Sequence, residues 1–197
     1  MRRTVVTAWG GRGAAAISCL IHVKGRSMRK GTAALTVCHD IALAAWFGGA
    51  WMGAVGLNGA TIEVDDHTQR TRVANAGWFR WAPIAGAALV THVASAYALG
   101  RLAPVAARRQ RGSARIRQLR TGITMAAILA TADTGLSGQR VVRGGDVPVA
   151  TAVVPIAATP PAVAAAQRRL RILQWLVPAF TATLFLCEVI QREQAPH

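Results

Sequence analysis

The chain has 197 residues, of which 52% are hydrophobic, and it carries a formal net charge of +15. The arginines are clustered between long uncharged runs, a pattern typical of a membrane protein with several spans and not of a soluble nucleic-acid-binding domain. The three cysteines show no paired spacing, which speaks against a disulfide framework.

Residues 1–30 are predicted to form a basic, poorly ordered extension ahead of the membrane domain. The weakly apolar run after Met1 is interrupted by Gly10, Arg12 and their neighbours, so it lacks the continuous apolar core of a signal peptide. Met28 opens a compact basic leader directly before the first apolar stretch. Translation starting at Met28 is therefore an alternative to translation starting at Met1.

The first predicted span covers residues 33–58, which are apolar for long enough to cross a bilayer as a helix. Gly49 and Gly53 form a GxxxG pair on one face of this helix, and Gly56 lies on the same face. Small residues at this spacing let a neighbouring helix backbone approach closely. We expect this face to pack inside the bundle, against another membrane protein, or against a second copy of the chain.

The second predicted span covers residues 82–100 and follows a polar loop. The sequence WFRW from Trp78 is typical of an aromatic belt at a membrane interface, and Pro83 suits the first turn of a helix. Ala88, His92 and Ala96 lie four residues apart and form a strip of small residues with one imidazole in it. Ala88 and Ala96 are predicted helix-packing positions.

The third predicted span covers residues 121–138. It follows the basic segment 101–120, which contains no acidic residue and is therefore expected on the cytoplasmic side. Residues 138–159 are predicted to be a loop, because Pro148 and Pro155 exclude a continuous spanning helix.

The fourth predicted span covers residues 172–190, after a basic helical lead-in that begins near Thr159 and before a polar tail at 193–197. Pro178 is expected to kink it. Residues 31–192 thus form one all-α domain, a polytopic membrane protein with a bundle of four transmembrane helices and both termini in the cytoplasm. We expect multi-pass insertion in a plasma membrane.

His39 and His92 are the candidate metal ligands. They lie on adjacent, antiparallel predicted spans, in the half of the bundle nearest the basic segment. Two facing imidazoles could hold a haem iron or a copper ion. The alternative is that each histidine forms a hydrogen bond to a neighbouring helix. The one further ligand candidate, on a different helix, is Met125.

Asp40 and Asp133 are acids within or beside apolar spans, where a carboxylate must be paired, neutral or at an interface. The predicted topology places them on opposite sides of the membrane. The expected partners are Arg101, Arg117 or Arg120 for Asp40, and Arg140 or Arg143 for Asp133. The functional alternative is a proton or cation path through a small transporter or channel.

The residues His39, Trp46, Gly48 and Gly49 have the spacing H-x6-W-x-G-G. This pattern resembles the first helix of copper-resistance D-type membrane domains, a resemblance that implies a role in copper import. Three longer segments, which start at His39, Val73 and Thr159, are similar to a group of small actinobacterial integral membrane proteins. That second resemblance implies the topology and no particular activity.

The sequence contains no catalytic motif, and we expect a protein that is not an enzyme and that needs no cofactor. The leading hypothesis is a structural or accessory subunit of the membrane, in contact with lipid and not with nucleic acid. The alternatives are a haem- or copper-binding bundle that uses His39 and His92, and a small transporter or channel.

Overall fold

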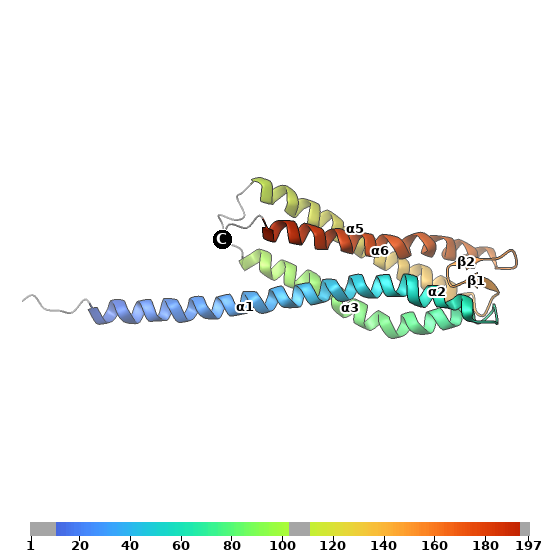
Figure 1. Cartoon of the computed structure of the whole chain (residues 1–197), viewed down its shortest axis with the longest axis horizontal. Helices are drawn as coiled ribbons and strands as arrows, with labels where there is room; N and C mark the ends of the chain where they lie inside the picture. The colour runs from blue at the N-terminus through green and yellow to red at the C-terminus, as the bar shows by residue number, and fades with distance from the viewer. Residues whose placement is uncertain (1–10, 103–110, 194–197) are drawn as a thin grey trace, which may run out of the picture.

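The structure is a computed structural model that describes residues 11–102 and 111–193, with side chains described from 31 to 102 and from 115 to 193. Four long helices lie side by side, each antiparallel to the next long helix along the chain (Figure 1). They are α1 (Gly11–Met52), α3 (Arg70–Leu102), α5 (Arg111–Arg143) and α6 (Pro161–Glu193). The end of α6 and the end of α3 lie at the same end of the bundle (Figure 1).

The first helical segment, made of α1 and the helical turns after it, extends beyond the predicted span at both ends. It begins at Gly11, so residues 11–30 are helical where a loose extension was expected, while residues 1–10 lie outside the described residues. After Met52 the chain continues through a π-helical turn η1 (Gly53–Leu57), a short helix α2 (Asn58–Ala60) and a 3-10 turn η2 (Thr61–Glu63).

Helix α3 also begins earlier than predicted, at Arg70. Asp66 ends the preceding turn by accepting hydrogen bonds from the Thr68 hydroxyl at 2.6 Å and the Thr68 backbone N–H at 2.8 Å, and these bonds hold the pKa of Asp66 below its usual value. As a result, Trp78 and Pro83 lie inside the helix and not at its entry. Figure 1 shows that α3 is bent, as expected for a helix with an internal proline.

A short hairpin covers the end of the bundle opposite the end of α6. Helix α5 runs to Arg143, past the predicted end of the third span, and the loop beyond it contains β1 (Val149–Thr151) paired antiparallel with β2 (Val154–Pro155). The buried guanidinium of Arg70 donates to the carbonyl of Ala150, and Thr61 Oγ1 accepts from Ala152 N–H at 3.0 Å. These bonds fix the hairpin against the start of α3 and the η2 turn.

Three of the helical segments are long and apolar enough to cross a membrane: Gly31–Glu63, Arg70–Leu102 and Pro161–Glu193. The all-helical prediction is therefore confirmed in this coarser form. Helix α5, which contains the predicted third span, is not among these segments. Its arginine-free stretch 121–138 is long enough, but Asp133 and several threonine and glycine residues lower its hydropathy. The predicted polar tail begins at Glu193, the last residue of α6, and its remaining residues lie outside the described part.

The two glycines of the GxxxG pair lie where α1 meets α3, and each faces an indole ring. A Cβ atom added to Gly49 would lie 2.0 Å from Trp81 Cζ2, and one added to Gly53 would lie 2.1 Å from Trp78 Cη2. The glycine face is therefore filled by tryptophan side chains of the same chain, where the sequence suggested close contact with a helix backbone. Gly56 lies on the exposed surface beside its own Met52.

The central core is apolar and includes one of the predicted alanines. Leu43 and Trp46 of α1, Ala127 of α5 and Leu184 of α6 form one buried cluster with Ala88. Ala96 is half-buried, nearer the end of α3. All four long helices thus contribute to one core, and the bundle is stabilised mainly by side-chain packing.

Replacing Gly53 by alanine is expected to destabilise the α1–α3 contact by about 1–3 kcal/mol, because the new methyl group collides with the Trp78 ring. Gly48 is the matched control, since a Cβ there meets nothing within 4 Å and alanine has the higher helix propensity. Thermal unfolding in detergent measures both. A Gly53→Ala protein as stable as Gly48→Ala would contradict the packing described here.

Candidate metal centre

His39 of α1 and His92 of α3 come together inside the bundle. Their rings are stacked, with centroids 4.2 Å apart and an angle of 19° between the ring planes. His39 is 4% exposed and His92 is 2% exposed. The two histidines singled out in the sequence are therefore neighbours.

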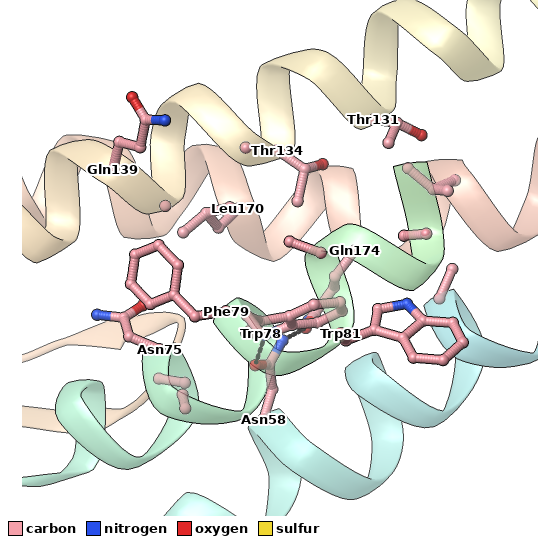
Figure 2. Close-up of a pocket in the computed structure, with 18 of the residues that line it drawn as sticks. Asn58, Asn75, Trp78, Phe79, Trp81, Thr131, Thr134, Gln139, Leu170 and Gln174 are labelled. Atoms are coloured by element: carbon pink, nitrogen blue, oxygen red, sulfur yellow. Dashed lines mark hydrogen bonds between the residues drawn. The ribbon is translucent and has the colours of Figure 1, made fainter. Parts of the chain in front are cut away.

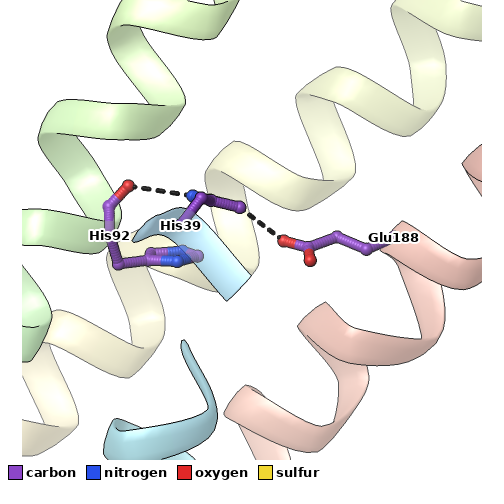
Figure 3. A group of neighbouring side chains, drawn as sticks. All are labelled: His39, His92 and Glu188. Carbon is purple, nitrogen blue, oxygen red and sulfur yellow. Dashed lines mark hydrogen bonds and ion pairs between the residues drawn. The ribbon is translucent and has the colours of Figure 1, made fainter. Parts of the chain in front are cut away.

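Glu188 of α6 completes the cluster (Figure 3). Its Oε1 atom lies 2.7 Å from His39 Nε2, and its side chain is buried. The potential ligand atoms of His39, His92 and Glu188 all lie within 4.8 Å of one another. Three helices thus deliver two imidazoles and one carboxylate to a single point.

The backbone of α3 sets the orientation of the His39 ring. His39 Nδ1 lies 3.2 Å from the carbonyl oxygen of His92 and 3.2 Å from Ser95 Oγ. A carbonyl oxygen only accepts, so Nδ1 carries the hydrogen, and Nε2 is directed at Glu188 (Figure 3). A proton must also lie between Nε2 and Oε1, because two lone pairs at 2.7 Å would repel each other.

Two atoms of the cluster have unused hydrogen-bonding capacity. His92 Nδ1 and Glu188 Oε2 are fully buried and have no hydrogen-bond partner among the described residues. Buried polar atoms are nearly always paired in native proteins, so each exception calls for an explanation. A metal ion ligated by His92 and Glu188 would give these two atoms a partner, provided that His92 Nδ1 is the unprotonated ring nitrogen.

Two arginines close the cluster toward the end of the bundle. Arg120 of α5 donates to Glu188 Oε1 at 3.1 Å and to Gln191 Oε1 at 2.6 Å. Arg192 donates to Asp40 Oδ1 at 2.5 Å, with its Nη2 atom 3.9 Å from Glu188 Oε2. These cations offset the charge of the buried carboxylate.

The partners of the two aspartates differ from those expected. Asp40 pairs with Arg192, and Asp133 pairs with Arg169 at 2.7 Å; both arginines belong to α6. The arginines expected for Asp40 came from the basic segment 101–120, and those expected for Asp133 follow it closely in the sequence. The actual partners come from α6 because its antiparallel course brings Arg192 to the level of Asp40 on α1, and Arg169 to the level of Asp133 on α5.

The geometry suits a single metal ion and not a haem. A haem iron with two histidine ligands has one imidazole on each face of the porphyrin, whereas these rings stack directly on each other with no space between them. Trp46 closes the inner side, with its ring edge-on to His92 at a centroid distance of 6.0 Å. Met125, the further ligand candidate, is 51% exposed, whereas the cluster residues are buried.

Glu188 is the residue that sequence reasoning missed. In the sequence it lies two residues before the end of the fourth predicted span. The signal in the sequence was the position of Glu188 along the helix. A carboxylate within the last turns of an apolar helix needs a partner at the same depth in the bundle. His39, near the start of an antiparallel helix, meets that condition.

Comparison of the chain with protein families, with characterised proteins and with solved structures gives no significant match.

Replacing Glu188 by glutamine is expected to destabilise the metal-free protein by about 3–5 kcal/mol, because the amide leaves Arg120 without its buried counter-ion. Glu193→Gln, on the exposed last turn of α6, is the matched control. Unfolding in detergent with a chelator present measures the difference. Equal stability of the two variants would show that Glu188 does not hold the helices together.

Proposed function

We propose that this protein is an integral membrane bundle that binds one divalent transition-metal ion at His39, His92 and Glu188. The observation that carries the proposal is the meeting of these three buried side chains, in which His92 Nδ1 and Glu188 Oε2 have no hydrogen-bond partner among the described residues. The proposal favours the metal-binding hypothesis over a purely structural or accessory role.

The donor set favours zinc or Cu²⁺. Imidazole nitrogen and carboxylate oxygen are ligands of intermediate or hard character, while Cu⁺ prefers thiolate and thioether sulfur. Ligand atoms around a tetrahedral ion lie roughly 3.3 Å apart. The ligand atoms of this cluster lie within 4.8 Å of one another, so side-chain rotation would bring the most distant pair closer by at most roughly 1.5 Å. The ion would replace the proton between His39 and Glu188.

The resemblance of the first helix to copper-resistance D-type domains supports the same reading. Of the residues that carry it, His39 belongs to the cluster and Trp46 packs against His92. Gly49 holds the Trp81 ring. Two of the four positions of the pattern thus lie at the proposed metal centre, and handling of a copper ion is the activity that the resemblance favours.

We also propose that all four long helices cross a plasma membrane, with both termini in the cytoplasm. Support for α5 as the fourth span comes from its outward face, where Met125, Leu129 and Leu136 are each more than half exposed. Large apolar side chains turned outward suit contact with lipid chains. The metal centre would then lie near the cytoplasmic end, beside Arg120 and Arg192.

The two other hypotheses have less support. The Gly49–Gly53 face is filled within the chain, so it gives no reason to expect a partner there. Asp40 and Asp133 are each held in an ion pair, which favours a structural role for these acids over an ion path.

Purified protein is expected to bind one equivalent of zinc or Cu²⁺, measured by titration calorimetry and by elemental analysis after dialysis. His39→Gln and His92→Gln should lose at least 10–100-fold in affinity, because each removes one nitrogen ligand. His67→Gln, in the exposed loop before α3, is the control and should bind normally. Metal retained by the His39→Gln and His92→Gln variants, or no binding by any form, would refute the proposal.

The proposed topology is tested with single cysteines in a background where the three natural cysteines are replaced by alanine. A membrane-impermeant maleimide should label Ala157→Cys, in the loop that carries the hairpin, on intact cells. It should label Ser113→Cys, in the basic region, only after permeabilisation, because arginine-rich segments stay in the cytoplasm. Labelling of Ser113→Cys from outside would reverse the orientation.

A further inference from the structure

A second feature of the bundle, separate from the metal centre, is an open slot between α3 and α5 (Figure 2). It has a volume of about 360 Å³ and lies in the half of the bundle nearer the hairpin. The two helices make few contacts with each other, whereas α1 packs closely on α3 and α5 on α6. The slot is the gap that this unequal packing leaves.

The walls of the slot are aromatic and aliphatic, and the polar groups among them are mostly satisfied. Trp78, Phe79 and Trp81 line the α3 side (Figure 2). On the α5 side the hydroxyls of Thr131 and Thr134 each donate to a carbonyl of their own helix at 2.8 Å. This part of the slot is therefore able to accept an apolar molecule without leaving the threonine hydroxyl donors unpaired.

The side chain of Asn58, which also lines the slot, has its hydrogen bonds satisfied within the protein. It accepts a hydrogen bond from Trp78 Nε1 at 2.9 Å and donates to Gln174 at 3.0 Å (Figure 2). This chain of bonds fixes the Trp78 ring as a rigid wall of the slot.

The mouth of the slot near the hairpin is polar. Asn75 of α3 and Gln139 of α5 both line it, and neither forms a hydrogen bond with the described residues. Next to Asn75, a shallower recess contains Arg72, whose guanidinium lies 3.9 Å from the exposed carboxylate of Asp146. The apolar slot thus has two amides at one end and, in the adjoining recess, an exposed arginine that Asp146 neutralises in part. This arrangement matches an anionic amphiphile with a single chain inserted in the slot.

We propose that the slot binds one acyl chain of an anionic bilayer phospholipid, with the phosphate at Arg72 and the amides of Asn75 and Gln139. The proposal rests on the membrane location proposed above. Along α5 the lining runs from Thr131 to Val142, a rise of about 16 Å, which matches the roughly 15 Å depth of one leaflet.

The slot is distinct from the metal centre, because the Trp46 ring lines the slot and also lies edge-on to His92.

Quenching of tryptophan fluorescence by brominated lipid tests the proposal. The starting variant has Trp9, Trp51 and Trp175 replaced by phenylalanine, so that the remaining three tryptophans all line the slot. It is reconstituted in vesicles that contain a rising fraction of phosphatidylglycerol with brominated chains, or of brominated phosphatidylcholine. We expect quenching that saturates at a low fraction of brominated phosphatidylglycerol and needs more phosphatidylcholine.

Gly135→Phe fills the slot, since Gly135 lines it and has open space at its Cβ position, and it should remove most of the saturable quenching. Gly122→Phe is the control, with equally open space on α5 outside the slot, and it should quench as the starting variant does. Equal quenching in all three variants, or quenching linear in the brominated fraction, would overturn the acyl-chain site.

Equal quenching by the two lipids would show that the slot does not prefer an anionic headgroup, and would overturn the proposed contact between Arg72 and the lipid phosphate. Loss of quenching as the protein-to-lipid ratio rises, together with cross-linked dimers, would assign the slot to a second copy. Failure of the protein to insert in vesicles would instead refute the membrane location, so the two proposals fail in different ways.

Discussion

One buried carboxylate holds the arginine-rich end of the bundle together. A charged Glu188 in a helix core costs several kcal/mol to desolvate, and this cost is offset only if partners surround it. His39 supplies a hydrogen bond from α1 and Arg120 supplies another from α5. His92 stacks on His39 and so connects α3 to the same group. The relative depth and rotation of all four helices at this end thus follow from compensating one negative charge.

The hairpin end of the bundle is held by shape. Trp81 and Trp78 of α3 pack against Gly49 and Gly53 of α1, so these two helices are in close contact here. Asn58 accepts a hydrogen bond from Trp78 and so fixes its ring. Helix α5 takes no part in this contact and packs instead on α6. The slot between α3 and α5 results from this unequal packing, because α5 places mainly small residues such as Thr134, Gly135 and Gly138 opposite the aromatic side chains of α3. The same bundle therefore has a closed polar end and an open apolar end.

The apolar runs predict the helices, because length and hydropathy are local properties of the chain. The pairing of His39 with His92 also follows from the sequence, since adjacent antiparallel spans place them at similar depth. Glu188 and Arg192 could not be assigned in the same way. Their partners depend on how α6 is rotated about its axis relative to α1, and this rotation is determined by packing across the whole bundle. The early start of α3 depends likewise on Arg70 bonding to a distant hairpin.

A purely structural network would explain the charges of the cluster but not its unpaired atoms. Groups retained only for stability are expected to be fully bonded, since a half-satisfied polar network is worse than an apolar core. Gln167, buried beside the hairpin, uses its amide nitrogen for two carbonyls and likewise leaves its oxygen without a hydrogen-bond partner in the described part of the chain, but it stands alone there. In the cluster, His92 Nδ1 has no hydrogen-bond partner among the described residues, and the nearest cation to Glu188 Oε2 among them, Arg192, lies 3.9 Å away. One ion ligated by both residues would meet both shortfalls, which is the arrangement that the proposed metal site requires.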